Sequence, residues 1–147
     1  MERYRKGSHT VHDIKYHFVW ITKYRYRVLR GDIAIRIRAI IREECASKDV
    51  RIVKGVVSAD HVHLMVSSPP SISPSYIAQQ LKGKSSYKIQ QEFPELKSRY
   101  WGRHMWARGY FCASSGAVTE EMLKAYIAGH TGDEETGDGF ELEGGPA

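Results

Sequence analysis

The stretch Ala59-Asp60-His61-Val62-His63-Leu64-Met65-Val66 places two histidines two residues apart within an apolar, β-branched run. Because successive side chains of a strand point to opposite faces, His61 and His63 would share one face, and the apolar residues between and after them would share the other. Two neutral imidazoles on one strand can hold a metal ion and leave coordination positions for water or a phosphate oxygen. The same pattern is typical of the polar side of a half-buried strand, so the motif alone leaves both interpretations open.

The segments around this strand predict an alternation of strands and helices. Apolar residues alternate over 14–21, recur at helical spacing after Gly31-Asp32, and follow the capping pair Ser73-Pro74. Strands are predicted over 14–21, 50–57, 61–67 and about 106–114, and helices over about 32–48, 73–92 and 119–129. Pro94 is expected to stop the second helix. The order β-α-β-β-α-β followed by a helix predicts an α+β, ferredoxin-like fold, with a four-stranded antiparallel sheet and two helices on one face.

This fold predicts where the histidines lie. If the apolar side of 61–67 packs under the two helices, His61, His63 and Met65 must lie on the open face of the sheet. The last helix is the remaining element that could cover that face. It carries Met122, Tyr126 and His130 at i, i+4 and i+8, along one stripe.

Length and charge indicate one basic domain followed by an acidic tail. The chain has 147 residues, enough for a core without disulfides or a structural metal, and Cys45 and Cys112 match no paired spacing. We assign residues 1–130 to a single domain and predict that 131–147 are disordered. The tail holds six of the 17 acidic side chains and none of the 22 basic ones, so residues 1–130 carry 11 acidic groups and a net charge of +11.

A basic body with interleaved aromatic residues indicates a polyanionic partner, and nucleic acid is favoured over membrane because no basic amphipathic anchor is evident. No signal-like or membrane-spanning apolar run is evident, which favours a cytoplasmic protein. The chain shows no P-loop glycine pattern, so no nucleotide cofactor is expected.

Several motifs together resemble the small single-tyrosine transposases of bacterial and archaeal insertion sequences, members of the HUH nuclease superfamily. The motifs are Tyr16-His17-Phe18-Val19-Trp20 with Lys23-Tyr24-Arg25, Asp60-His61-Val62-His63, Leu81-Lys82-Gly83-Lys84-Ser85-Ser86, Trp106-Ala107-Arg108-Gly109-Tyr110 and Lys124-Ala125-Tyr126-Ile127. The resemblance covers about residues 10–130. It implies the HUH fold with a C-terminal helix carrying the nucleophilic tyrosine.

The resemblance also implies an activity, which is the cleavage and rejoining of single-stranded DNA at insertion-sequence ends. Tyr126 would form a 5′-phosphotyrosine link, and a divalent ion, Mg²⁺ or Mn²⁺, would be held by His61 and His63. The DNA would carry hairpin ends. The protein would work as a homodimer in which the tyrosine helix of one subunit completes the histidine site of the other.

One position departs from the family pattern. The family typically has a glutamine four residues after the tyrosine as a third metal ligand, and this chain has His130 there. An imidazole can bind the same ion, so the resemblance makes His130 the expected third ligand. A histidine at a helix C-terminus is also favoured by the helix dipole, and a tyrosine such as Tyr126 on an amphipathic stripe is ordinarily a core residue.

The basic side chains form the expected DNA-binding set, through contacts to phosphates and bases. Its members are Lys23, Arg25, Arg27, Arg36, Lys82, Lys84, Lys88, Arg103 and Arg108. The main alternative is a protein that binds hairpin DNA or RNA without cutting it, either a domesticated relative or an RRM-like module using the aromatics Tyr16 and Phe18. A histidine-triad hydrolase is a weaker alternative, because Met65 stands where that pattern needs a third histidine.

Overall fold

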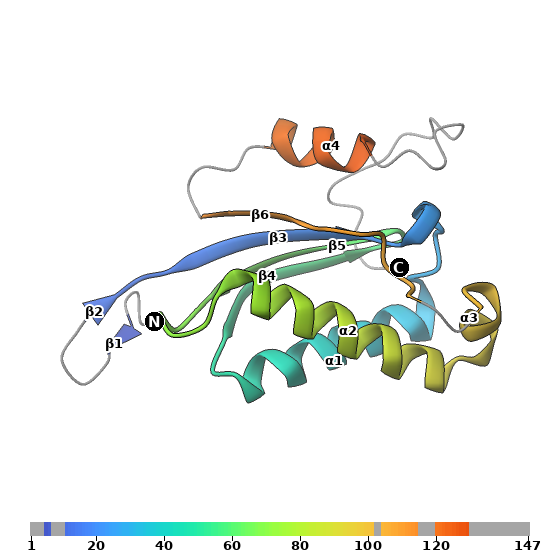
Figure 1. Ribbon diagram of the computed structural model, residues 1–147, viewed down its shortest axis with the longest axis horizontal. Coiled ribbons are helices and arrows are strands. Elements are labelled where there is room, and N and C mark those ends of the chain that lie inside the picture. The colour runs from blue at the N-terminus through green and yellow to red at the C-terminus, as the bar shows by residue number, and fades with distance from the viewer. Residues whose placement is uncertain (1–4, 7–10, 102–103, 115–119, 130–147) are drawn as a thin grey trace.

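The computed structural model describes residues 5–6, 11–101, 104–114 and 120–129 (Figure 1). Arg103, His130 and the acidic tail 131–147 lie outside the described residues, so the predictions made for them stay predictions. Within the described part of the chain, no helix is long and apolar enough to cross a membrane.

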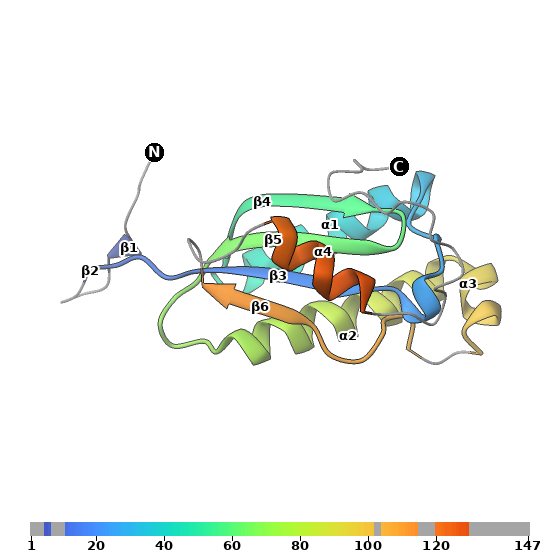
Figure 2. The ribbon, with the colours of Figure 1, turned by 90° about the horizontal axis from the view of Figure 1, so that it is seen from above.

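A four-stranded antiparallel sheet forms the centre of the molecule (Figure 2). Its strands, in spatial order, are β4 (Arg51–Ser58), β5 (His61–Ser67), β3 (Lys15–Ile21) and β6 (Phe111–Ser114). All three neighbouring pairs run antiparallel, as the ferredoxin-like prediction requires. A separate two-residue pair, β1 (Arg5–Lys6) with β2 (Val11–His12), was not predicted.

The predicted strand over 106–114 is wrong in its first half. Only Phe111–Ser114 forms β6, and Trp106 joins the sheet through a single bridge to Thr22. The Nζ atom of Lys82 donates hydrogen bonds to the carbonyl oxygens of Ala107 and Gly109, at 3.0 and 2.7 Å. Gly109 has a φ of +77°, outside the strand region. Because the carbonyls of Ala107 and Gly109 bind Lys82, they do not form the hydrogen bonds of a regular β-sheet, and the strand begins at Phe111.

The helices divide between the two faces of the sheet (Figure 1). On one face lie α1 (Gly31–Ser47), α2 (Pro74–Glu92) and the short α3 (Pro94–Arg99), and on the other lies α4 (Glu120–Ala128). The Ser73 side chain caps α2 by accepting the backbone N–H of Tyr76 at 3.1 Å. Pro94 ends α2, as expected, and then occupies the first turn of α3, which was not predicted.

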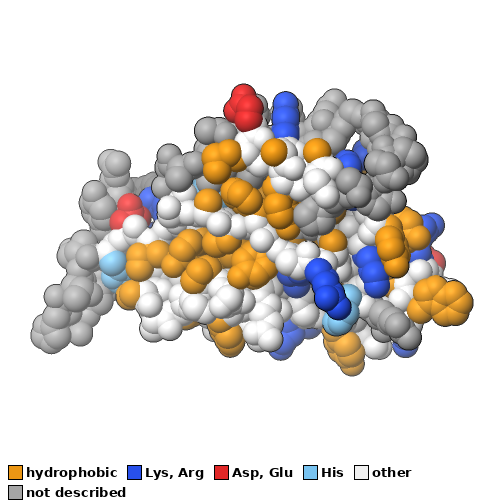
Figure 3. All heavy atoms as spheres, turned by 45° about the horizontal axis from the view of Figure 1, so that its top comes forward, with side chains coloured by type: hydrophobic (Ala, Val, Ile, Leu, Met, Phe, Trp, Pro, Cys, Tyr) orange, Lys and Arg blue, Asp and Glu red, His pale blue; other side chains and the backbone are white. Residues whose placement is uncertain are grey.

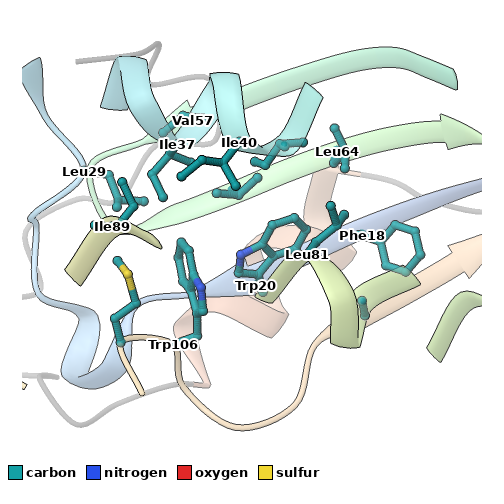
Figure 4. Packing of buried hydrophobic residues seen from close by; sticks show 14 of the residues in the cluster. Phe18, Trp20, Leu29, Ile37, Ile40, Val57, Leu64, Leu81, Ile89 and Trp106 are labelled. Carbon is teal, nitrogen blue, oxygen red and sulfur yellow. The ribbon is translucent and has the colours of Figure 1, made fainter. Parts of the chain in front are cut away.

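The hydrophobic core fills the space between the sheet and α1 and α2 (Figure 4). Phe18 and Trp20 of β3 and Leu64 of β5 point into it and are at most 2% exposed. The rings of Trp20 and Trp106 meet edge to face, with centroids 5.9 Å apart. Phe18 is buried beneath the helices, so it cannot stack on a nucleic-acid base. This observation weakens the RRM-like alternative, which requires Phe18 and Tyr16 as exposed aromatic residues of the sheet.

Candidate active site on the second face of the sheet

The second face carries the histidine pair, as the strand alternation predicts. In the register of β3 with β5, Val19 lies opposite His63 and Ile21 lies opposite His61. Helix α4 covers this face through Ile127, which is fully buried against Val19 and Ile21. Figure 3, which turns the α4 side forward, shows hydrophobic side chains gathered on this side of the molecule. Helix α4 therefore lies against the sheet face that carries His61 and His63.

His61 is held by a buried carboxylate. Its Nδ1 atom lies 2.9 Å from Oδ1 of Asp60, and the two side chains are 0% and 3% exposed. The other oxygen, Oδ2, accepts a hydrogen bond from Nε of Arg25 at 3.2 Å. Hydrogen bonding from His61 and the nearby Arg25 charge outweigh burial and lower the pKa of Asp60 below its usual range. Asp60 was not among the site residues predicted from the sequence.

Arg25 reaches Asp60 because the backbone before it turns unusually. Tyr24 and Arg25 have φ angles of +61° and +54°, a left-handed conformation that is rare for side-chain-bearing residues. Thr22 anchors the turn, since its backbone N–H donates to the carbonyl of Asp60 at 2.9 Å and its hydroxyl to the carbonyl of Tyr26 at 2.7 Å. The turn directs the Arg25 guanidinium inward, where its side chain is only 9% exposed.

His63 has a neighbour that the sequence analysis did not identify. Its Nε2 lies 3.1 Å from Nδ1 of His17 on β3. Burial, followed by the charges of His17, His61 and Lys54, lowers the pKa of His63 to about 4. Burial also lowers the pKa of His17. The two rings are therefore neutral at neutral pH, and one donates its N–H to the other.

Tyr126 lies on the side of α4 that faces the sheet. It is half-buried against the cluster of Val19, Ile21 and Ile127, and its ring centroid is 5.6 Å from that of Phe111. Burial raises the pKa of its hydroxyl to about 12, so the phenol is protonated at neutral pH. A nucleophilic role would need a base or a cation to favour the phenolate.

The histidines have the chemistry of metal ligands. When Nδ1–H of His61 donates to Asp60, Nε2 carries the lone pair that a metal ion needs, and a carboxylate behind a histidine is a common second contact in metal sites. His63 is neutral and can supply a second nitrogen. Within the described part of the chain, no three His, Cys, Asp or Glu side chains are placed to hold an ion. The expected third ligand, His130, lies outside that part.

The basic residues predicted to bind DNA fall into groups. Arg25 and Arg27 lie near Asp60, and Arg36 pairs with Glu92 at 2.7 Å. Lys88 lies 3.8 Å from Glu43 and from Glu44, and Lys23 lies over the Tyr24 ring. Lys82 binds backbone carbonyls, Lys84 and Arg108 are exposed, and Arg103 is not described. The DNA-binding role of all nine stays a prediction.

Comparison with known proteins decides the family. A family model described as "Transposase IS200 like" matches residues 10–130. The chain belongs to the IS200-like transposase family. Its fold and its HVH strand agree with the sequence resemblance to single-tyrosine transposases of insertion sequences, and IS200-like transposases are enzymes of DNA transposition.

Individual IS200-like transposases match along most of their length. The chain is 34% identical to the transposase of insertion element IS200 from Salmonella typhimurium, over 89% of this chain and 86% of that protein. It is 31% identical to the ISDra2 transposase TnpA of Deinococcus radiodurans, over 84% and 88% of the two chains.

Solved structures share the fold. A crystal structure from Deinococcus radiodurans described as a transposase superimposes with a TM-score of 0.80 and 29% identity, covering 86% of this chain and 97% of the other. A REP tyrosine transposase bound to a REP hairpin superimposes with a TM-score of 0.53 and 13% identity, covering 86% and 68%. The second likeness concerns the fold alone.

Proposed function

We propose that this IS200-like transposase cleaves and rejoins single-stranded DNA at insertion-sequence ends through a 5′-phosphotyrosine intermediate. The observation that carries the proposal is the position of Tyr126, on the helix that covers the sheet face of His61 and His63, in a chain of this family. The finer steps below follow from the chemistry of these residues.

Tyr126 is the proposed nucleophile. Its phenolic oxygen attacks the scissile phosphorus, a Tyr–O–P bond forms, and the bond from phosphorus to the 3′ oxygen breaks. The phenolic proton leaves Tyr126, and the departing strand gains a proton to become a 3′-hydroxyl. The phosphotyrosine is itself a phosphodiester, so attack by another 3′-hydroxyl rejoins DNA without ATP.

His61 and His63 are the proposed holders of a divalent ion, Mg²⁺ or Mn²⁺, with His130 as third ligand. A bound ion would polarise the scissile phosphate and favour the phenolate at neutral pH. Asp60 fixes the ring of His61 by accepting Nδ1–H, and Arg25 fixes Asp60. These contacts fix the orientation of the His61 ring and therefore the direction in which the Nε2 lone pair points.

Single-stranded DNA with hairpin ends is the proposed substrate. Residues 1–130 carry a net charge of +11, which suits a polyanion. The REP transposase of similar fold was solved with a hairpin bound, which supports a hairpin here as well.

The proposal is tested by adduct formation. Wild-type protein with Mn²⁺ and end-labelled single-stranded DNA from the ends of its element should give a protein–DNA species that survives SDS and heat. Tyr126→Phe removes only the attacking oxygen and should abolish that species while retaining DNA binding. Tyr76→Phe, at an exposed tyrosine of α2, is the matched control and should behave like wild type. A Tyr126→Phe protein that still forms the adduct contradicts the assignment, and a wild type that binds but never cuts supports the non-catalytic alternative.

We further propose a homodimer whose active sites are shared. The surface that α4 buries, around Val19 and Ile21, is the same in two copies, so exchanged helices would make equivalent contacts. Mixing Tyr126→Phe with His61→Ala, each inactive alone, would create sites with one intact tyrosine and one intact histidine pair. Adduct formation should return to about a quarter of the wild-type level in an equal mixture of random dimers. No recovery, or a monomer by light scattering, contradicts sharing.

A further inference from the structure

A β-bulge in β4 places Lys54 on the same face of the sheet as the histidines. Ile52 and Lys54 pair with consecutive residues of β5, so Val53 between them is an extra residue in the ladder. Lys54 therefore lies opposite Met65, on the histidine face. In a ladder without the bulge it would lie opposite Leu64, on the face that packs against α1 and α2. Bulges often redirect a side chain beside an active site, and this one redirects a lysine.

The residues after the bulge show why Lys54 keeps this orientation. Gly55 lies opposite Leu64 on the core face, where an added Cβ would come within 3.2 Å of Leu64 Cδ1. Val57, two residues later, is buried in the core, and Val56 between them lies opposite His63. Core packing therefore fixes the alternation that places Lys54 on the histidine face.

Lys54 lies in one row with a histidine across the sheet. Met65 is opposite Lys54 on one side and opposite His17 on the other, so the three residues cross the face side by side. Burial is the largest cause of the lowered pKa of His17 and of His63, and the positive charge of Lys54 contributes to both. The ammonium group is thus close enough to the histidines to act on a ligand bound there.

The charge of Lys54 is not neutralised by the protein. Its side chain is exposed, and among the described residues no carboxylate forms an ion pair with it. By contrast, Arg36 pairs with Glu92, and Arg25 pairs with Asp60. The four strands of the sheet contain no acidic residue. An anion that approaches this face therefore meets an available cation and no like charge from the strands.

We propose that Nζ of Lys54 donates a hydrogen bond to a phosphate oxygen of the DNA strand that lies at the histidine site. The inference rests on the proposed single-stranded DNA substrate and adds a residue that holds this strand beside the proposed metal ligands. β4 forms the edge of the sheet, next to the strands that α4 crosses (Figure 2). A DNA strand that enters over this edge meets Lys54 before it reaches the histidines.

Strand binding measured without chemistry is the first test. Tyr126→Phe protein in EDTA is titrated with a short, unpaired, fluorescein-labelled DNA strand, and anisotropy is followed at several salt concentrations. Adding Lys54→Gln should weaken the affinity by about threefold to tenfold. It should also reduce the slope of log affinity against log salt by about 0.7, the contribution of one phosphate contact on a single strand. Lys54→Arg keeps the positive charge and should retain most of the affinity.

Arg42 provides a control that is matched in charge. It is exposed on α1, on the other side of the sheet, so Arg42→Gln lowers the net charge equally without changing the histidine face. Arg42→Gln should leave the affinity and the salt slope close to those of the parent protein. Equal losses in Lys54→Gln and Arg42→Gln would show that net charge alone matters and would overturn the inference.

Metal binding separates a phosphate contact from a structural role. The positive charge of Lys54 repels a cation near His63, so Lys54→Gln should bind Mn²⁺ as tightly as wild type or slightly more tightly in calorimetric titration. Its Tm should be nearly unchanged, because the side chain is exposed. If Lys54 merely held the histidines in place, the substitution would weaken Mn²⁺ binding together with DNA binding, and that result would contradict the phosphate contact.

Adduct formation by the wild type tests the proposed function separately. Strand affinity and salt slope that are unchanged in Lys54→Gln overturn the role of the lysine, even if the wild type cuts DNA. A wild type that forms no adduct, but whose strand affinity depends on Lys54 and not on Arg42, instead overturns the cleavage proposal and leaves the phosphate contact standing.

Discussion

The two faces of the sheet are built from alternate residues of the same strands, yet they differ in composition. One face presents Phe18, Trp20 and Leu64 to α1 and α2, and these side chains are buried in a continuous core. The other presents His17, His61 and His63 beside a small apolar cluster that holds α4. The alternation therefore separates the residues that stabilise the fold from those that could do chemistry, without requiring a second domain.

The largest expected effect is on the histidine face. His61→Ala should reduce metal-dependent cleavage by about 10³-fold or more, because it removes a proposed ligand and the partner of Asp60. Calorimetric titration with Mn²⁺ should show weakened binding for this variant, whereas Tyr126→Phe should bind Mn²⁺ as wild type does. Chelation by EDTA should leave the Tm nearly unchanged, since the core lies on the other face. Melting on chelation would show that the site is structural.

A matched change on the core face should affect stability instead. Phe18→Ala is expected to lower the free energy of unfolding by about 3–5 kcal/mol, the usual cost of removing a buried aromatic ring. Urea unfolding followed by circular dichroism measures this directly. Any folded fraction should still bind Mn²⁺ with wild-type affinity. Selective loss of metal binding in a fully stable Phe18→Ala protein would contradict the division of labour between the faces.

The pH dependence of stability sharpens the comparison further. The unfolded chain protonates His63 near its ordinary pKa of 6.5, but the folded protein does so only near pH 4. The contribution of neutral His63 to the free energy of unfolding is therefore fully present above about pH 6.5. It is lost as the pH falls toward 4, and the loss amounts to at most roughly 3 kcal/mol. His17 contributes in the same direction. Unfolding free energies measured between pH 7.5 and 5 without metal should show a shallower slope for His63→Gln. Equal slopes would contradict a buried neutral His63.

The smallest expected effect concerns His130. If its side chain is a ligand, His130→Gln should preserve cleavage, because the amide can also bind an ion one turn from Tyr126. His130→Ala should raise the Mn²⁺ concentration needed. Imidazole titrates and the amide does not, so acidification should raise the metal requirement of wild type more than that of His130→Gln. Cleavage measured against Mn²⁺ concentration at several pH values tests this. Superimposable curves for wild type and His130→Ala would exclude a ligand role.

The sequence was sufficient for features that depend on local periodicity. The order of elements and the side of β5 that carries His61 and His63 follow from periods of two and 3.6 residues, and both are confirmed. The contact between His17 and His63 depends on the register in which β3 pairs with β5. The residues of either strand alone do not determine that register, so the contact could not be predicted from the sequence. The inward direction of Arg25 depends on the left-handed backbone conformation of Tyr24 and Arg25. Neither residue is a glycine, so the sequence gives no signal of this conformation.

The prediction that the last strand begins near residue 106 was wrong because of another contact between distant segments. Its first residues have strand-like composition, but a lysine 25 residues earlier binds their carbonyls. Such a contact is a property of tertiary packing, which overrides local propensity. The sequence therefore placed the candidate site on the correct face, while the contacts that orient its side chains required the structure.

The chain order of the sheet also has a consequence for synthesis. The central strand β3 emerges first, its partner β5 follows, and β6 and the helix bearing Tyr126 come last. A nascent chain in which α1, α2 and three strands have already folded would hold the histidines but still lack the tyrosine. Because Ile127 packs on the finished surface of β3, the helix that carries the proposed nucleophile can dock only after the strands and helices that hold the histidines have folded.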